Sequence, residues 1–246
     1  MNGIFPNVNS ETIPQLTTDH MIEVDRAMIE DFGIELIQMM ENAGRGLARV
    51  AMSRFLAEPD HDKKVLVCAG RSGNGGGALV AARRLHNWGI NVEVAISRPA
   101  ESFQGIPKHQ LTIVQNLGIP VYDQALSFQT PQLILDGIIG YSLKGSPRER
   151  AADLIHFANE STAPVLSLDT PSGIDTASGT AHNPTISANA TVTLALPKAG
   201  LFSKSTAHLV GELYLADISV PPKLYSALNF TVSDQLFATS DIVRLV

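Results

Sequence analysis

The stretch Val65-Leu66-Val67-Cys68-Ala69-Gly70-Arg71-Ser72-Gly73-Asn74-Gly75-Gly76-Gly77-Ala78-Leu79-Val80 decides the fold of this chain. An apolar run breaks into a glycine cluster and then continues with the composition of a helix. Glycine reaches backbone angles that other residues avoid, and the free N–H groups at the start of a helix attract an anion. The stretch therefore predicts a strand, a phosphate-binding loop and a helix, although a glycine-rich turn without a ligand fits the same pattern.

The composition indicates one enzyme-sized domain. The chain has 246 residues, 44% of them hydrophobic and 17% charged, which is enough to bury one large core. A net charge of -6 disfavours nucleic acid and acidic membranes as partners. Cys68 is the only cysteine, so a disulfide within the chain and a zinc cluster of thiolates are excluded. We therefore expect a cytoplasmic protein.

Residues 1–15 have the composition of a tail that precedes this domain. Residues 1–15 have neither the charged start nor the apolar stretch of a signal peptide, and no later segment has the length and composition of a membrane span. We expect a flexible tail over residues 1–15 and a single domain over 16–246.

Helical and strand patterns alternate along the rest of the chain. We expect helices over residues 16–32, between Gly33 and Pro59, and over 76–88, 108–117 and 148–159. We expect strands over residues 65–69, 92–97, 121–122, 133–139, 165–168, 190–196 and 212–217, and a surface loop over 176–185. Apolar strands that alternate with helices imply an α/β fold with a mainly parallel sheet covered on both faces.

Two further motifs follow strands, at the edge where open α/β sheets bind ligands. Asp136 interrupts the apolar run 133–139, and a carboxylate there needs a partner. Asp169 and Asp175 flank a Pro-Ser-Gly turn directly after the run 165–168. Such carboxylate, hydroxyl and carbonyl oxygens suit a hard cation. Loop amides that satisfy Asp136 and a purely structural turn are the alternatives.

At these three motifs the sequence resembles the YjeF N-terminal family, the NAD(P)H-hydrate epimerases. The matching segments are residues 70–83, 136–140 and 169–175, followed by Pro197-Lys198-Ala199-Gly200-Leu201. Residues 16–46 also match the opening of the family. The resemblance thus covers nearly the whole chain after residue 15, and its motifs occur in the order of the family.

The resemblance implies a Rossmann-like, three-layer α/β/α domain that is often a homodimer. It also implies an isomerase of metabolite repair that interconverts the R and S C6 epimers of hydrated NADH and NADPH (NADHX and NADPHX). A dehydratase then acts on these hydrates. Because the chain ends at Val246, we expect that dehydratase to be a separate polypeptide.

The resemblance also assigns roles to residues of the three motifs. Asp169 is the expected catalytic residue and contacts the substrate. The expected potassium ligands are Asn74, Asp136 and Ser172. The expected substrate-binding residues form two loops, Gly73, Asn74, Gly75, Gly76 and Gly77 in the first, and Gly140, Tyr141, Ser142, Leu143, Lys144, Gly145 and Ser146 in the second.

The chain departs from the family pattern within these loops. Gly73 stands where the family has Asn, Gly77 where it has Asp, and Tyr141 and Ser142 replace a Thr-Gly pair. A glycine at position 77 cannot transfer a proton, whereas an aspartate can. A catalytically impaired nucleotide-binding or scaffold protein of the same fold is therefore the alternative to an active epimerase.

Overall fold

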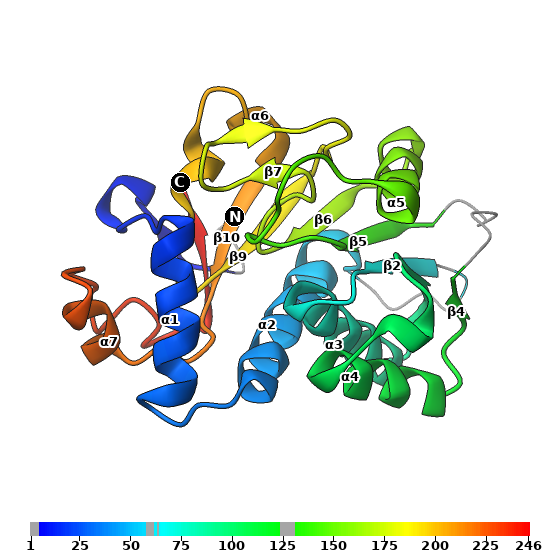
Figure 1. Ribbon diagram of the computed structural model, residues 1–246, viewed down its shortest axis with the longest axis horizontal. Coiled ribbons are helices and arrows are strands. Elements are labelled where there is room, and N and C mark those ends of the chain that lie inside the picture. The colour runs from blue at the N-terminus through cyan, green and yellow to red at the C-terminus, as the bar shows by residue number, and fades with distance from the viewer. Residues whose placement is uncertain (1–4, 58–61, 63, 124–130) are drawn as a thin grey trace.

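The structure, a computed structural model, describes residues 5–57, 62, 64–123 and 131–246. In this part of the chain a central sheet has the strand order β1-β11-β10-β9-β6-β5-β2-β3-β4 (Figure 1). All neighbouring strands in it are parallel except β10 and β11. The strands are β1 (Asn7–Val8), β2 (Lys64–Ala69), β3 (Asn91–Ile96), β4 (Val121–Tyr122), β5 (Leu133–Gly137), β6 (Val165–Leu168), β9 (Ala190–Leu194), β10 (Glu212–Ala216) and β11 (Ile242–Leu245).

Helices cover both faces of the sheet. Figure 1 shows α2, α3 and α4 on one face and α5 on the other. The helices are α1 (Thr18–Glu30), α2 (Leu36–Val50), α3 (Gly73–Asn87), α4 (Gly105–Asn116), α5 (Glu149–Glu160), α6 (Ala207–Val210) and α7 (Pro222–Ala227). Shorter helical turns occupy Ser10–Thr12, Ala51–Phe55, Ala100–Ser102 and Ala199–Phe202.

The two faces have separate apolar cores because successive strand residues point to opposite sides. Val65 and Val67 of β2 belong to the large core beneath α2, α3 and α4. Leu66 of the same strand packs in the smaller core with Leu154 and Ile155 of α5. These layers confirm the three-layer α/β/α, Rossmann-like fold with a mainly parallel sheet.

Helix α3 begins three residues earlier than expected. Gly73, Asn74, Gly75 and Gly76 are helical, although glycine disfavours helix interiors. Close packing explains Gly75 and Gly76: a Cβ atom on Gly75 would lie 1.8 Å from the carbonyl oxygen of Gly70, and one on Gly76 would lie 2.6 Å from Met40 Sδ. The glycine cluster is therefore mostly the first turn of a helix, and only Gly70 precedes it.

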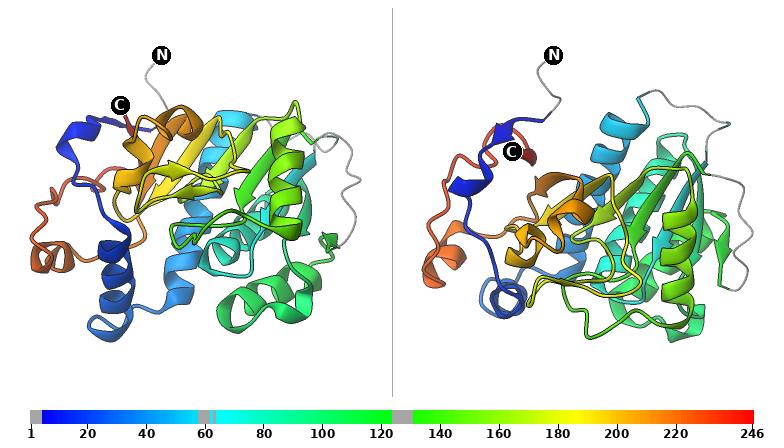
Figure 2. Two further views of the ribbon diagram at one scale, coloured as in Figure 1. Left: turned by 45° about the horizontal axis from the view of Figure 1, so that its top comes forward. Right: turned by 90° about the horizontal axis from the view of Figure 1, so that it is seen from above.

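The expectation of a flexible tail over residues 1–15 is wrong for residues 5–15. Strand β1 pairs with β11, and the backbone N–H of Ser10 donates to the carbonyl oxygen of Val246 at 2.9 Å. Phe5 and Ile13 are buried. These apolar side chains and the open edge of β11 hold the segment on the domain, so the two ends of the described chain lie side by side (Figure 2). Residues 1–4 lie outside the described residues.

Residues 176–185 also differ from expectation. They are not only a loop, because β8 (Thr180–Ala181) pairs with β7 (Ile174–Asp175) in a small antiparallel hairpin. Elsewhere the expected strands end within two residues of the observed ones. None of the helices in the described part of the chain combines the length and the apolar composition of a membrane span.

Candidate active site

A pocket opens at the carboxyl ends of β5 and β6, where α1, α2 and the start of α3 meet the sheet. Half of the lining residues are apolar and come from α1, α2, the sheet and the segment after it: Met21, Leu36, Met39, Met40, Ala43, Leu168, Leu194 and Ile218. The rest are polar residues and glycines: Asp25, Ser72, Gly73, Asn74, Gly140, Tyr141, Ser142 and Asp169. An apolar lining with a few polar groups is typical of a small-molecule site.

Asp169 lines the pocket and directly follows β6. Its φ angle of +67° is the left-handed conformation, which a non-glycine residue rarely adopts. The backbone N–H of Asp169 donates to the carbonyl oxygen of Val192 at 2.7 Å, which anchors it to β9. A strained residue that its surroundings hold in place is a mark of functional sites.

Lys198 is the charge partner of Asp169. Its side chain is fully buried, and its ammonium group donates to Asp169 Oδ1 and, at 2.8 Å, to the carbonyl oxygen of Leu194. The backbone N–H of Tyr141 donates to Asp169 Oδ2 at 3.3 Å. Both carboxylate oxygens of Asp169 are thus held, and the sequence analysis did not identify the ion pair.

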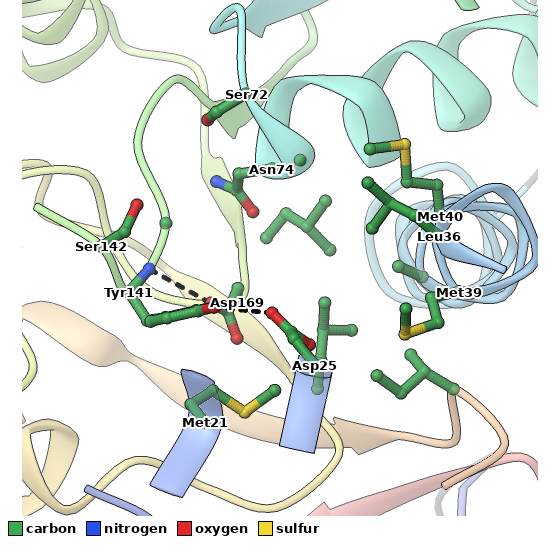
Figure 3. Close-up of a pocket in the computed structure, with 16 residues that line it drawn as sticks. Met21, Asp25, Leu36, Met39, Met40, Ser72, Asn74, Tyr141, Ser142 and Asp169 are labelled. Carbon is green, nitrogen blue, oxygen red and sulfur yellow. Dashed lines mark hydrogen bonds between the residues drawn. The ribbon is translucent and has the colours of Figure 1, made fainter. Parts of the chain in front are cut away.

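Asp25 is a second carboxylate in this pocket. It lies on α1, and its Oδ2 accepts a hydrogen bond of 2.6 Å from the hydroxyl group of Tyr141. Figure 3 shows this contact beside Asp169, with Leu36, Met39 and Met40 across the pocket. Burial and the neighbouring Asp25 raise the pKa of Tyr141, so the phenol stays protonated and donates.

Sequence reasoning gave Asp25 no role, although a signal was present. Met21, Val24 and Met28 form the apolar stripe of α1, and Asp25 lies next to Val24 and Met21 on that side of the helix. A carboxylate beside a core-facing stripe needs a partner. That partner, Tyr141, is 116 residues away in the sequence.

Asp136 is fully buried, and protein donors satisfy its carboxylate. Ser172 donates to it through Oγ at 2.6 Å and through its backbone N–H at 2.9 Å. The Ser167 hydroxyl and the backbone N–H of Ile138 complete the set at 2.8 and 3.2 Å. Burial raises the pKa of Asp136, and the hydrogen bonds from Ser172, Ser167 and Ile138 oppose that rise. The hydrogen bonds match the alternative in which the loop satisfies this acid.

Asn74 has buried polar atoms without a partner. Neither Oδ1 nor Nδ2 of its side chain has a hydrogen bond within the described structure. The side chain lies against Gly140, whose added Cβ would be 3.4 Å from Asn74 Oδ1. Asn74 and the segment after Asp136 are therefore neighbours. An unsatisfied buried amide is costly, so Asn74 is a candidate for contact with a bound group.

Gly75, Gly76 and Gly77 of the first expected loop face the protein. A Cβ on Gly76 would lie 2.6 Å from Met40 Sδ, and one on Gly77 would lie 2.8 Å from Leu168 Cδ2. Gly75, Gly76 and Gly77 do not line the pocket. Their small size lets α3 approach α2 and β6 closely, which is a structural reason for glycine here.

The second expected loop is divided between the pocket and the surface. Gly140, Tyr141 and Ser142 line the pocket, whereas Leu143, Lys144, Gly145 and Ser146 do not. Thr176 fixes the inner part by donating to the carbonyl oxygen of Tyr141 at 3.1 Å. The second acid of the Pro-Ser-Gly turn, Asp175, accepts from Ala177 and Ser178 and shapes that turn.

Comparison with known proteins identifies the family. The model of the YjeF-related protein N-terminus matches residues 36–200. The chain belongs to the YjeF N-terminal family. The protein named NAD(P)H-hydrate epimerase of Dehalogenimonas lykanthroporepellens is 36% identical over 243 residues, which cover 98% of this chain and 96% of that protein. A protein of the same name from Truepera radiovictrix is 37% identical over 79% of this chain and 84% of its own length.

Longer members of the YjeF N-terminal family also match. The bifunctional NAD(P)H-hydrate repair enzyme Nnr of Moorella thermoacetica is 32% identical over 87% of this chain, and the chain spans 42% of its length. Among solved structures, yeast ynu0 (YNL200c) superposes with a TM-score of 0.82 at 25% identity and covers 95% of this chain. The fold expected from the family is therefore observed in a solved relative.

Proposed function

We propose that this protein is an NAD(P)H-hydrate epimerase, which interconverts the R and S C6 epimers of hydrated NADH and NADPH. The names and coverage of its relatives support this activity. The observation that carries the proposal is Asp169, a buried carboxylate that Lys198 and Tyr141 hold at the edge of an open pocket. This position, at the carboxyl ends of parallel strands, is where α/β sheets bind ligands.

The reaction requires little beyond proton transfer and charge stabilisation. C6 of the hydrate carries a hydroxyl group next to the ring nitrogen. When that hydroxyl is protonated, the C6–O bond breaks, water leaves, and the nitrogen lone pair forms a C=N bond. Water then adds to the opposite face of C6 and loses a proton. Asp169 would face the cationic ring and accept this proton, while Met39 and Met40 lie across the pocket as an apolar wall for the ring.

A potassium ion fits the residues next to the pocket. In the described part of the chain, uncharged groups donate the hydrogen bonds to the buried Asp136 carboxylate, and the buried amide of Asn74 has no partner. Asn74, Asp136 and Ser172 would hold the ion through amide, carboxylate and hydroxyl oxygens, which suit a hard cation. Bound there, potassium would offset the charge of Asp136 and of the substrate pyrophosphate.

The altered loops do not close the pocket. Gly73, Tyr141 and Ser142 line the cavity rather than filling it. The open pocket favours an active enzyme over the impaired nucleotide-binding or scaffold protein. The position without its family aspartate, Gly77, points toward Leu168 and Ala43.

We also propose that the enzyme is a homodimer, that it is coupled to a dehydratase, and that it works in the cytoplasm. Exposed Ile22, Ile29 and Phe32 on and just after α1 support a homodimer, which light scattering would detect. The bifunctional names of the longer relatives support functional coupling to an NAD(P)H-hydrate dehydratase. The single buried thiol, Cys68, supports a reducing compartment such as the cytoplasm.

The activity can be tested with one purified epimer of the NADH hydrate. We expect wild-type protein to convert it to the other epimer, followed by chromatography, at a rate proportional to protein concentration. Asp169→Asn should lower kcat on the order of a hundred-fold, as loss of an acid–base group does. Asp175→Asn is the matched control, because Asp175 shapes a turn outside the pocket, and it should retain activity. A wild type no faster than buffer would refute the proposed function.

A further inference from the structure

Asp25 is a candidate for chemistry that nothing above assigns. It precedes the segment matched by the family model, which begins at residue 36. It lines the pocket together with Asp169, so carboxylates reach one cavity from α1 and from the end of β6. A role for Asp25 rests on the proposed epimerase function, and it would specify which group supplies the proton.

Tyr141 links the two carboxylates. Its hydroxyl group donates to Asp25 Oδ2 at 2.6 Å, and its backbone N–H donates to Asp169 Oδ2 at 3.3 Å. Thr176 holds the same residue by donating to its carbonyl oxygen at 3.1 Å. Asp25 and Asp169 are thus held relative to one another by a single residue (Figure 3). Fixed geometry of this kind is what acid–base catalysis requires.

The surroundings of the two acids differ in charge. Asp169 has the ammonium group of Lys198 as a direct partner. In the described part of the chain, the one hydrogen bond of the Asp25 side chain comes from the neutral Tyr141. Burial raises the pKa of Asp25, and the Tyr141 hydrogen bond and the Lys198 charge oppose that rise, while the Asp169 charge adds to it. Two carboxyl groups in unlike surroundings can divide the roles of acid and base.

We propose that Asp25 is the general acid of the epimerisation and that Tyr141 is its positioning residue. The protonated carboxyl group of Asp25 gives its proton to the C6 hydroxyl group, the C6–O bond breaks, and water leaves. After water adds to the opposite face of C6, its proton passes to Asp169. Proton exchange with solvent then restores both acids, so nothing is consumed. Groups on two different elements suit this reaction because the hydroxyl leaves one face of C6 and returns on the other.

The first test replaces Asp25 in the full-length protein. We expect Asp25→Asn to lower kcat for the purified NADH-hydrate epimers on the order of a hundred-fold, with a smaller change in KM. Asp19→Asn is the matched control, since Asp19 lies exposed on the same helix, and it should keep full turnover. If wild type is active and Asp25→Asn retains turnover within threefold, the role of Asp25 is overturned while the epimerase function stands. If wild type itself is inactive, both proposals fail together.

The second test uses the pH profile of Tyr141→Phe, which keeps the carboxyl group in place. A general acid is active when protonated, so kcat/KM falls as pH rises through the pKa of Asp25. The Tyr141 hydrogen bond lowers that pKa, so its removal should move this limb to higher pH. If Tyr141 had a purely structural role, Tyr141→Phe would lower kcat/KM without changing the pH at which kcat/KM falls. An unmoved limb would overturn the proposal, and this readout remains available if Asp25→Asn does not fold.

Discussion

The buried ammonium group of Lys198 forms a hydrogen-bonded ion pair with the carboxylate of Asp169. The backbone on either side of Lys198 is hydrogen-bonded to Leu16, just before α1. The N–H of Leu16 donates to the carbonyl oxygen of Pro197 at 2.8 Å, and the N–H of Ala199 donates to that of Leu16 at 2.9 Å. Three segments that are distant in sequence therefore meet at Asp169: the entry to α1, the end of β6 and the turn after β9. This junction places Asp25 and Asp169 in one pocket.

Breaking this ion pair should destabilise the fold. Lys198→Met removes the charge that compensates buried Asp169, and the loss of one partner of a buried pair costs about 3–5 kcal/mol. Urea unfolding should show this loss, whereas Lys204→Met, at an exposed lysine of the same region, should stay within about 0.5 kcal/mol of wild type. Adding Asp169→Asn to Lys198→Met should recover part of the loss. A Lys198→Met variant as stable as wild type would mean that the pair contributes nothing to stability.

Potassium should raise the melting temperature. An ion that binds only the folded state adds about 1.4 kcal/mol at ten times its Kd, or roughly 3–6 °C in Tm for a chain of this size. We expect potassium chloride to raise Tm relative to tetramethylammonium chloride at equal ionic strength. Asn74→Ala should remove the difference, and Asn87→Ala, at the far end of α3, should preserve it. Equal melting temperatures of the wild type in the two salts would argue against the ion site.

The loss of folding stability at acidic pH should depend on Glu212 at the start of β10. Hydrogen bonds from Arg54 lower the pKa of Glu212, and the Tyr214 hydroxyl adds a further one at 2.7 Å. A lowered pKa in the folded state gives stability that is present above the ordinary glutamate pKa of about 4.3 and is lost as pH falls through the folded value. Glu212→Gln should therefore cost under about 1 kcal/mol at pH 7 and flatten the loss toward pH 3. Chemical unfolding at pH 7 and pH 3 measures the free energy of unfolding of both proteins. If Glu212→Gln lost as much stability as wild type between these pH values, Glu212 would not contribute to the pH dependence.

Local sequence patterns predicted the sheet well and the edges of the fold poorly. The apolar run Val165–Leu168 is a strand as expected, because a continuous apolar run between turns has few alternatives in an α/β chain. Strand β1 has only two residues and forms because it pairs with β11, more than 230 residues away. No local sequence pattern predicts such a strand. The helical start of α3 was hidden for a similar reason, since contacts with Gly70 and Met40 override the low helix propensity of glycine.

The candidate site was predicted in part for the same physical reason. Asp136 lies near the end of β5, Asp169 and the Asn74 loop follow strands, and parallel strands bring their carboxyl ends to one edge. Asp25 lies on helix α1 and Lys198 lies in the turn after β9, so the rule for strand ends predicts neither position. Their place follows from how α1 packs across the sheet edge, which a single sequence does not specify.

The most direct test of the central claim is the approach to equilibrium from both sides. Separate samples of the pure R and the pure S hydrate of NADH are incubated with wild-type protein, with Asp169→Asn and with buffer, and the epimer ratio is followed by chromatography. An epimerase must bring both wild-type samples to the same ratio, with rates proportional to protein concentration, and Asp169→Asn should slow both approaches on the order of a hundred-fold. Wild-type rates equal to those in buffer, from either side, would contradict the claim that this pocket is an epimerase site.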